Sequence, residues 1–231
     1  MRIVKNIFSS ILVVLIFFFC FISLVNISFY LLYIETPVKG FSMRPTLNIN
    51  VTDPEADGDI IYINQYAEVN RNDIVVAKVD WHEDLIIKRV VGVPGDKIEI
   101  KDENTHYGLY VNDSLVYTKE RNGVNEPFNK TGTNGYYGYY LAFLENEDYG
   151  PSGKNIIQSD ESGKYIKLGE YDYFLMGDNW GQTTDSIFKG PEKASSFIGK
   201  VDLIVDVTND NLFVQTWFFL KKLFSWKFNK F

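Results

Sequence analysis

The chain begins with a long apolar run. Residues 7–34 contain no charged side chain, and residues 11–19 are large and apolar throughout. A helix needs about 20 apolar residues to cross a bilayer. A cleaved export signal is the alternative, but its apolar region usually covers about 7–15 residues and ends in small ones. This run ends with Phe29, Tyr30 and Tyr33, so it predicts one uncleaved transmembrane anchor within residues 1–35.

Charges at the two ends of the run predict its orientation. Arg2 and Lys5 precede it, and Glu35 follows it. Cytoplasmic flanks of membrane helices carry an excess of Lys and Arg. We therefore expect the N-terminus in the cytoplasm and the rest of the chain on the other side of the membrane.

Beyond the anchor the pattern changes to short β-branched runs bounded by turn residues, which is typical of strands. No helical period of convincing length occurs between the two ends of the chain. The sequence therefore predicts a mainly β protein with a core of residues 36–101 and 171–210. The predicted strands are residues 60–63, 74–79, 85–91, 97–100, 109–111, 115–117, 171–176 and 201–205.

Two segments depart from this pattern. Residues 102–170 are rich in Asn, Gly, Tyr and acidic residues, which suits loops and short hairpins, so we expect a β-rich insertion there. Residues 211–231 mix large apolar side chains with lysines and are too short and too charged to span a bilayer. They predict an amphipathic segment on the membrane surface or, alternatively, a terminal helix packed on the core.

Composition narrows the classes of partner. The 231 residues carry a net charge of -7, which argues against a nucleic-acid partner because such proteins present a basic face. Cys20 is the single cysteine, so no intrachain disulfide can form.

Two patches contain candidate catalytic residues. Ser42 precedes Pro45, which pushes Arg44 toward an extended conformation and places the serine on an irregular connection. Lys88 lies in an apolar strand, on the face of Ile86 and Val90 if the strand alternates. Burial would lower the pKa of the lysine, and a neutral amine can accept a proton from serine. The alternatives are a serine in an ordinary turn and an exposed, charged lysine.

A third patch, residues 177–186, supplies Asp178, Asp185 and several hydroxyl groups after a hydrophobic run. These side chains could orient a lysine by hydrogen bonds, although Asp, Asn and Gly clusters also simply form turns. A fourth patch, residues 71–76, reads as a turn into a core strand and has no predicted chemistry.

In their order along the chain, the patches resemble the sequence boxes of bacterial type I signal peptidases. Ser-Met-x-Pro-Thr-Leu occurs at residues 42–47, and a turn-and-strand box occurs at residues 72–76. Lys-Arg-Val-x-Gly-x-Pro-Gly-Asp occurs at residues 88–96, and Gly-Asp-Asn with a later Asp-Ser occurs at residues 177–186. The resemblance implies a β-rich catalytic core, similar to that of signal peptidases and LexA, with a β-rich insertion.

The resemblance also implies a mechanism. Ser42 would be the nucleophile, Lys88 the general base, and the backbone N–H of Ser42 an oxyanion donor. Gly40 stands where some members have a second donor, a serine. No metal or cofactor is implied. The partners would be the lipid bilayer and the signal peptides of exported preproteins, cut after Ala-x-Ala by a monomer in the bacterial cytoplasmic membrane. The residues implied to line shallow pockets for small side chains are Val38, Met43, Leu47, Ile86 and Ile87.

Two positions differ from the family pattern. Thr183 stands where the family usually has Ser, and its hydroxyl is expected to bond to the Lys88 amine. Ile187 stands where the family has Arg, so Asp185 lacks its usual partner, for which Lys189 is a candidate. Arg89 is expected to pair with Asp178, as in the family.

Two other readings remain. A self-cleaving LexA-type regulator also uses a Ser–Lys dyad, but it carries a DNA-binding domain where this chain has a membrane helix. An inactive or narrowly specialised membrane-tethered paralogue is suggested by Thr183 and Ile187, whereas the intact Ser42 and Lys88 argue for activity. Relatives of the endoplasmic reticulum carry His at the position of Lys88, so the sequence indicates a bacterial enzyme.

Overall fold

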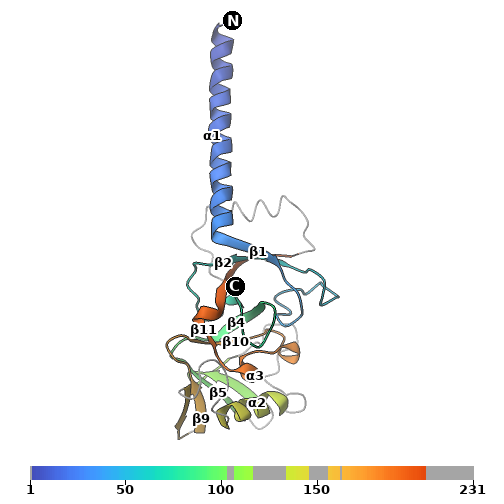
Figure 1. Ribbon diagram of the computed structural model, residues 1–231, viewed down its shortest axis with the longest axis vertical. Coiled ribbons are helices and arrows are strands. Elements are labelled where there is room, and N and C mark those ends of the chain that lie inside the picture. Colours follow the sequence, from blue (N-terminus) through green and yellow to red (C-terminus); the bar gives the residue numbers. More distant parts are fainter. Residues whose placement is uncertain (1, 103–106, 117–133, 146–155, 162, 207–231) are drawn as a thin grey trace.

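A long N-terminal helix projects from a β-rich body (Figure 1). The computed structural model describes residues 2–102, 107–116, 134–145, 156–161 and 163–206. Helix α1 covers Arg2–Leu32. Its segment Ile7–Val25 is long and apolar enough to cross a membrane, and none of it is buried against the rest of the described chain. The predicted apolar helix is therefore present, and the expected C-terminal segment 211–231 lies outside the described residues.

The first sheet follows α1 without a linker. Strand β1 begins at Tyr33 and pairs with β2, so the last three residues of the expected anchor region are part of the sheet. All pairs in this sheet are antiparallel, in the order β1-β2-β12-β3-β4-β10-β11. The strands are β1 Tyr33–Pro37, β2 Ile60–Asn64, β3 Ile74–Ala77, β4 Ile86–Gly92, β10 Asp172–Met176, β11 Glu192–Lys193 and β12 Phe197–Val205.

The second sheet lies at the end of the body away from α1 (Figure 1). It is antiparallel in the order β7-β6-β5-β9-β8. Every strand predicted from the sequence overlaps an observed strand, which confirms the mainly β fold. The elements of this part are β5 Lys97–Asp102, β6 Tyr107–Val111, β7 Ser114–Leu115, α2 Asn134–Glu145, β8 Ile157–Asp160, β9 Gly163–Lys167 and α3 Ser186–Lys189. Two short 3-10 turns, η2 Trp180–Gln182 and η3 Ala194–Ser196, complete the described elements.

Helix α2 corrects the expectation of loops and hairpins in the centre of the insertion. Its glycines and tyrosines are weak helix formers, which is why the sequence pattern does not indicate it. Tyr140 and Leu144 are four residues apart, share one face, and are both buried in the core of the second sheet with Leu109 and Ile166. Tertiary burial of that face therefore stabilises a helix that local propensity does not predict.

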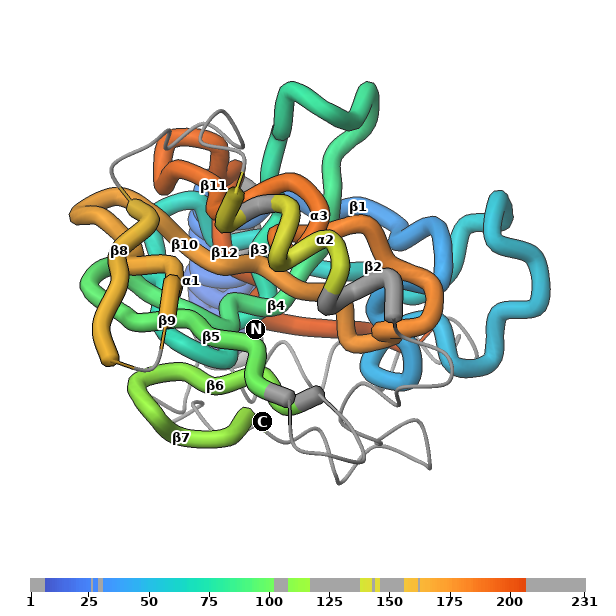
Figure 2. Tube along the Cα trace, turned by 90° about the horizontal axis from the view of Figure 1, so that it is seen from below, coloured from blue at the N-terminus to red at the C-terminus, as the bar shows by residue number. Residues whose placement is uncertain are grey.

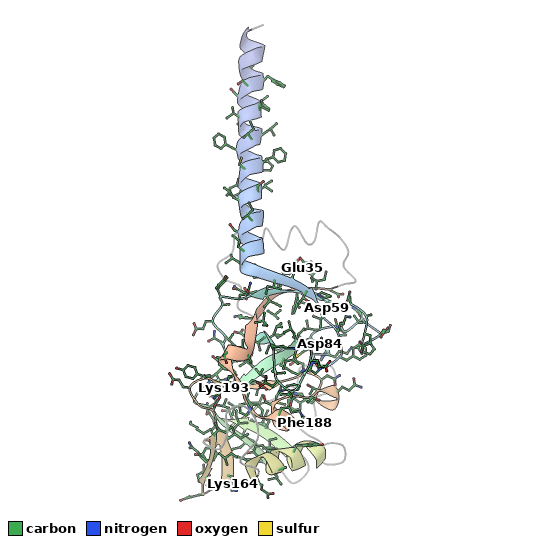
Figure 3. All side chains as sticks on the ribbon, in the orientation of Figure 1. Glu35, Asp59, Asp84, Lys164, Phe188 and Lys193 are labelled. Atoms are coloured by element: carbon green, nitrogen blue, oxygen red, sulfur yellow. The ribbon has the colours of Figure 1, made fainter. Side chains whose placement is uncertain are left out.

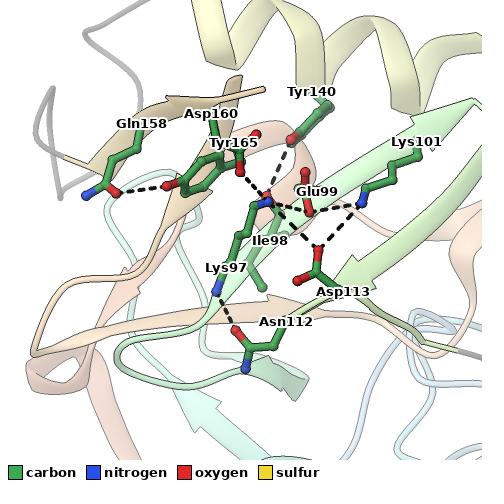
Figure 4. Close-up of polar contacts among 10 residues, drawn as sticks. All are labelled: Lys97, Ile98, Glu99, Lys101, Asn112, Asp113, Tyr140, Gln158, Asp160 and Tyr165. Atoms are coloured by element: carbon green, nitrogen blue, oxygen red, sulfur yellow. Dashed lines mark hydrogen bonds and ion pairs between the residues drawn. The ribbon is translucent and has the colours of Figure 1, made fainter. Parts of the chain in front are cut away.

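A network of charges braces the second sheet (Figure 4). The Lys97 Nζ lies 3.1 Å from Glu99 on its own strand and 2.7 Å from Asp160 on β8. The Lys101 Nζ lies 3.3 Å from the same Glu99 carboxylate and 3.7 Å from Asp113 in the β6–β7 turn. The hydrogen bond to Asp160 raises the pKa of Lys97. These contacts tie β5 to β8 and to the β6–β7 turn within the second sheet.

Candidate active site

Ser42 lies on the irregular connection between β1 and β2, as the sequence predicts. The loop is anchored from below by the buried side chains of Met43 and Leu47. Asn48 holds it from the side, because its side-chain amide donates to the carbonyl oxygens of Val38 at 3.1 Å and Gly40 at 3.0 Å. The loop therefore presents the serine from a fixed backbone.

Lys88 lies in the middle of β4, opposite Val75 of β3. It is only 5% exposed, and Ile86 and Val90 on the same face are also buried. The distance from Lys88 Nζ to Ser42 Oγ is 3.0 Å. Burial lowers the pKa of the Lys88 amine, and the negative charges of Asp185 and Asp178 oppose that effect. The reading of Lys88 as an exposed lysine at a strand edge is therefore wrong.

Arg89 points to the other face and pairs with Asp178, as expected. The pair is bidentate, with 2.7 Å from Arg89 Nε to Oδ1 and 2.7 Å from a terminal guanidinium nitrogen to Oδ2. The Thr46 hydroxyl also donates to Asp178 at 2.5 Å. One largely buried carboxylate thus connects the serine loop, β4 and the end of β10. A bidentate charged pair of this kind is rigid as well as strong.

Asn179 holds the serine loop and has no role in the sequence prediction. Its backbone N–H donates to the carbonyl oxygen of Ser42 at 2.9 Å, and its side-chain amide donates to the carbonyl oxygen of Phe41 at 3.0 Å. In the sequence, only the Gly-Asp-Asn motif points to Asn179. Its contact with Phe41 spans 138 positions, so no local pattern predicts it.

Asp185 is fully buried and is held by backbone groups. It accepts hydrogen bonds from the N–H of Ile187 at 3.1 Å and of Gly177 at 3.2 Å. Burial raises its pKa to about 6, although these bonds and the charge of Lys88 act in the opposite direction. The suggested ion pair with Lys189 is absent among the described residues. Ile187 is buried in an apolar cluster with Phe174, so an apolar contact replaces the expected arginine.

Thr183 does not make the expected hydrogen bond to Lys88. Its hydroxyl oxygen is buried and has no hydrogen-bond partner within the described part of the chain. It lies near enough to Asp185 to help lower the pKa of that carboxyl group. The position of Thr183 therefore differs from its predicted role as a direct support of the lysine.

A groove of about 700 Å³ opens in front of Ser42 and Lys88. Four of the five predicted pocket residues line it, namely Val38, Met43, Ile86 and Ile87. Leu47 is not among the lining residues; it is 1% exposed and packs in the core beneath the serine loop. In this structure the apolar side chain of Leu47 packs beneath the serine loop, and its role in substrate binding stays a prediction.

Two surface connections that the sequence did not single out form the outer walls of the groove. One is residues 53–57 before β2, and the other is residues 78–85 between β3 and β4; both project from the body (Figure 2). The second connection contains Asp84, labelled in Figure 3 in the half of the molecule nearer to α1. Within the described residues, no cluster of His, Cys, Asp or Glu is placed to hold a metal ion.

The serine is hydrogen-bonded to a buried lysine at the base of an open groove. This arrangement is suited to acyl-transfer chemistry. The chain matches the family model of signal peptidase, peptidase S26, over residues 7–206. It therefore belongs to the signal peptidase family S26, whose members are peptidases.

Curated relatives agree with this assignment. Signal peptidase I of Streptococcus pneumoniae serotype 4 is 26% identical over 192 residues, which cover 79% of this chain and 87% of the relative. Signal peptidase I V of Bacillus subtilis strain 168 is 27% identical over 176 residues, which cover 73% and 83%. A crystal structure of a signal peptidase I from Enterococcus faecalis V583 aligns with 22% identity and a TM-score of 0.34, over 58% of this chain and 97% of that one.

Proposed function

We propose that this protein is a membrane-anchored serine endopeptidase that removes signal peptides from exported preproteins. Ser42 is the nucleophile and Lys88 the general base. The observation that carries the proposal is the 3.0 Å contact between Lys88 Nζ and Ser42 Oγ, made by a lysine that is almost completely buried. A nucleophile and a base within hydrogen-bond reach are the signature of covalent catalysis by hydrolases.

The lowered pKa of Lys88 supports its role as a base. Neutral Lys88 takes the Ser42 hydroxyl proton while Oγ bonds to the scissile carbonyl carbon. The resulting ammonium then gives that proton to the leaving amine as the C–N bond breaks, which leaves an acyl group on Ser42. Water, deprotonated by Lys88, attacks the acyl carbon; the bond between that carbon and Ser42 Oγ then breaks, Lys88 returns the proton to Oγ, and the signal peptide leaves with a free carboxylate. Each proton that Lys88 accepts is returned, so the lysine ends neutral.

The backbone N–H of Ser42 is suited to stabilise the oxyanion. It makes no hydrogen bond to any other described residue, so it remains available for a negatively charged oxygen. One such donor is typically worth about 3 kcal/mol of transition-state stabilisation. The N–H of Gly40, by contrast, already donates to the carbonyl oxygen of Pro54 at 2.8 Å.

The part of the groove next to Ser42 supports a preference for small side chains before the cut. Val38 and Met43 are buried, and Ile86 and Ile87 form the adjoining wall. These apolar side chains border the groove beside the serine, which suits a small apolar side chain such as alanine. We therefore infer cleavage after Ala-x-Ala and similar sequences.

The place of the groove in the fold supports a substrate at the membrane. Its lining begins at Thr36, four residues beyond the end of α1 at Leu32. We infer a single-pass protein with Arg2 and Lys5 on the cytoplasmic side and the groove close to the opposite membrane surface. The dyad and the groove are built from one chain, which supports a monomer as the working unit.

A catalytically inactive or narrowly specialised paralogue is the second candidate. Two observations favour it: the Thr183 hydroxyl does not support Lys88, and Ile187 replaces an arginine beside Asp185. The intact contact between Ser42 and Lys88 favours the active enzyme.

Peptide cleavage tests the proposal. Wild type, Ser42→Ala and Lys88→Ala are compared in detergent between pH 6 and 10, on a preprotein-derived peptide with one Ala-x-Ala site. We expect cleavage after the second alanine by wild type alone, with a rate that rises with pH as Lys88 loses its proton. Cleavage by the Ser42→Ala protein would contradict the dyad, and inactivity of wild type on several such peptides would favour the second candidate.

A further inference from the structure

The outer part of the groove has no role in the mechanism above. It is formed by the connection between β3 and β4, which contributes Trp81, His82, Asp84 and Leu85. Leu85 is 46% exposed although it is large and apolar, and the exposed Pro37 and Pro54 also line the groove. The outer groove therefore offers apolar surface that the rest of the described chain leaves uncovered.

The direction of β4 shows which part of a substrate reaches this surface. Residues Lys88, Ile87, Ile86 and Leu85 follow one another, and a strand rises about 3.3 Å per residue. Leu85 is thus about 10 Å from the reacting lysine. Because Ile86 and Ile87 border the pockets for the residues before the cut, the outer groove continues on that same side. It faces a substrate residue about four or five positions before the scissile bond.

Trp81 is held in place in this outer part by packing and by one hydrogen bond. It is half-buried and packs against the apolar cluster of Ala77, Val79 and Ile86. Its indole N–H donates to the carboxylate of Glu192 on β11 at 2.7 Å, across 111 positions in sequence. A fixed aromatic ring offers a large contact area with little loss of conformational entropy on binding.

Glu192 is a buried acidic group that the mechanism does not use. It is 4% exposed, and among the described residues the indole of Trp81 is the side chain that donates to it. Burial raises its pKa, and the hydrogen bond from Trp81 acts in the opposite direction. A buried carboxylate needs such a donor. The hydrogen bond therefore fixes Trp81, in the connection between β3 and β4, to Glu192 on the edge strand β11.

We propose that Trp81 and Leu85 form an outer subsite for a large aliphatic side chain of the substrate, four or five residues before the cut, and that Glu192 is the positioning residue that orients Trp81. This inference rests on the proposed function. The occupant is the substrate itself, because the subsite is continuous with the groove that contains Ser42 and Lys88.

The test uses the full-length protein in detergent and matched peptides with one Ala-x-Ala site. The peptides carry either leucine or alanine at the fourth or fifth residue before the cut. We expect kcat/KM of wild type to favour leucine on the order of tenfold. Trp81→Ala should bring that ratio close to one, and Leu85→Ala, an exposed change that spares the fold, should lower it severalfold. A general loss of structure would slow both peptides alike and leave the ratio unchanged.

Variants of Glu192 separate positioning from mere stability. Glu192→Gln retains an acceptor for the indole and should keep the preference, whereas Glu192→Leu should lose most of it. Tyr66→Ala, which removes an exposed aromatic side chain outside the groove, is the matched control and should behave as wild type.

Several results would overturn the subsite: no leucine preference in wild type, a full preference in Trp81→Ala, or a preference that disappears as the detergent concentration rises, which would assign the surface to acyl chains. If wild type cuts none of the peptides, the proposed function fails. Direct binding of the fluorescently labelled leucine and alanine peptides to wild type and Trp81→Ala then decides the subsite independently.

Discussion

The backbone N–H of Asn179 donates a hydrogen bond to the carbonyl oxygen of Ser42 at 2.9 Å. The two residues come from the connection after β10 and the loop after β1, so this bond joins two distant parts of the chain at the proposed nucleophile. The side chain of Asn179 repeats the contact one residue earlier, at Phe41. The serine loop is therefore held by hydrogen bonds to Asp178 and Asn179, in addition to the buried side chains of the loop itself.

Removal of the Asn179 side chain is expected to impair turnover more than substrate binding. Asn179→Ala loses the bond to the Phe41 carbonyl oxygen but keeps the backbone bond to Ser42. A net loss of about 1 kcal/mol in transition-state stabilisation corresponds to roughly fivefold in kcat, with little change in KM. Steady-state kinetics on the Ala-x-Ala peptide measure this. Asn50→Ala, at an exposed position, is the control, and an unchanged kcat in Asn179→Ala would show that the loop is held without this contact.

The buried pair of Arg89 and Asp178 should matter far more for stability than the exposed pair of Lys39 and Asp57. Asp178→Ala leaves the largely buried guanidinium without its partner, so we expect a loss of about 3 kcal/mol in the free energy of unfolding. Asp57→Ala breaks a contact of 3.7 Å between exposed groups, which is worth less than about 1 kcal/mol. Denaturant unfolding in detergent compares the two variants. Equal effects would contradict a structural role for the Asp178 pair.

The pH dependence of activity should respond to Asp185. Its negative charge raises the pKa of Lys88, so Asp185→Asn, which retains an acceptor for the Ile187 N–H, should lower that pKa further. The rising limb of the pH–rate profile is then expected to move to lower pH. A matched Asp57→Asn variant should leave the limb in place. A shift of the Asp185→Asn profile to higher pH would reverse the assigned sign of this interaction.

Asp185 also predicts a pH dependence of stability. Burial raises the pKa of Asp185 from its ordinary value of 3.8, which applies in the unfolded chain, to about 6 in the folded protein. The folded state therefore binds more protons than the unfolded state between these two pH values. Stability should therefore fall as pH rises from about 4 to 6, and the Asn variant should lack this component. Thermal unfolding of both proteins at pH 4.5 and 7 measures the difference.

Thr183 should tolerate loss of its hydroxyl group. The buried Oγ1 meets no geometric criterion for a hydrogen bond among the described residues and has only a minor interaction with the Asp185 carboxylate, so Thr183→Val removes a poorly paired polar atom and nearly preserves the shape. We expect the free energy of unfolding to stay equal to wild type or to rise by about 1 kcal/mol, with activity within about threefold. A loss of activity comparable to that of Lys88→Ala would show that the hydroxyl contacts the lysine during the reaction.

Much of this architecture is visible in the sequence because it depends on local patterns. The charge-free run at residues 7–34 is long enough for a helix that crosses a bilayer, and alternation along residues 86–90 places Lys88 on the buried face. Strand positions follow from β-branched runs between turn residues. The proximity of Ser42 and Lys88 came from the resemblance of the boxes and was not visible in any periodicity.

Other features depend on which elements become neighbours, and no local pattern contains that information. Helix α2 is stabilised because Tyr140 and Leu144 pack against the second sheet. Leu47 is buried because the serine loop places it against Ile61 and Ile63 of β2. Asn179 and Glu192 act on partners more than 100 positions away.

The sequence by itself therefore determined the long apolar helix and the β-rich class, since each depends on side chains close together in the chain, and its motifs indicated Ser42 and Lys88 as the candidate dyad. Only the tertiary structure decided the supports of the serine loop, the position of the Thr183 hydroxyl away from Lys88 and the outer wall of the groove, because the order of strands in the sheet sets those contacts.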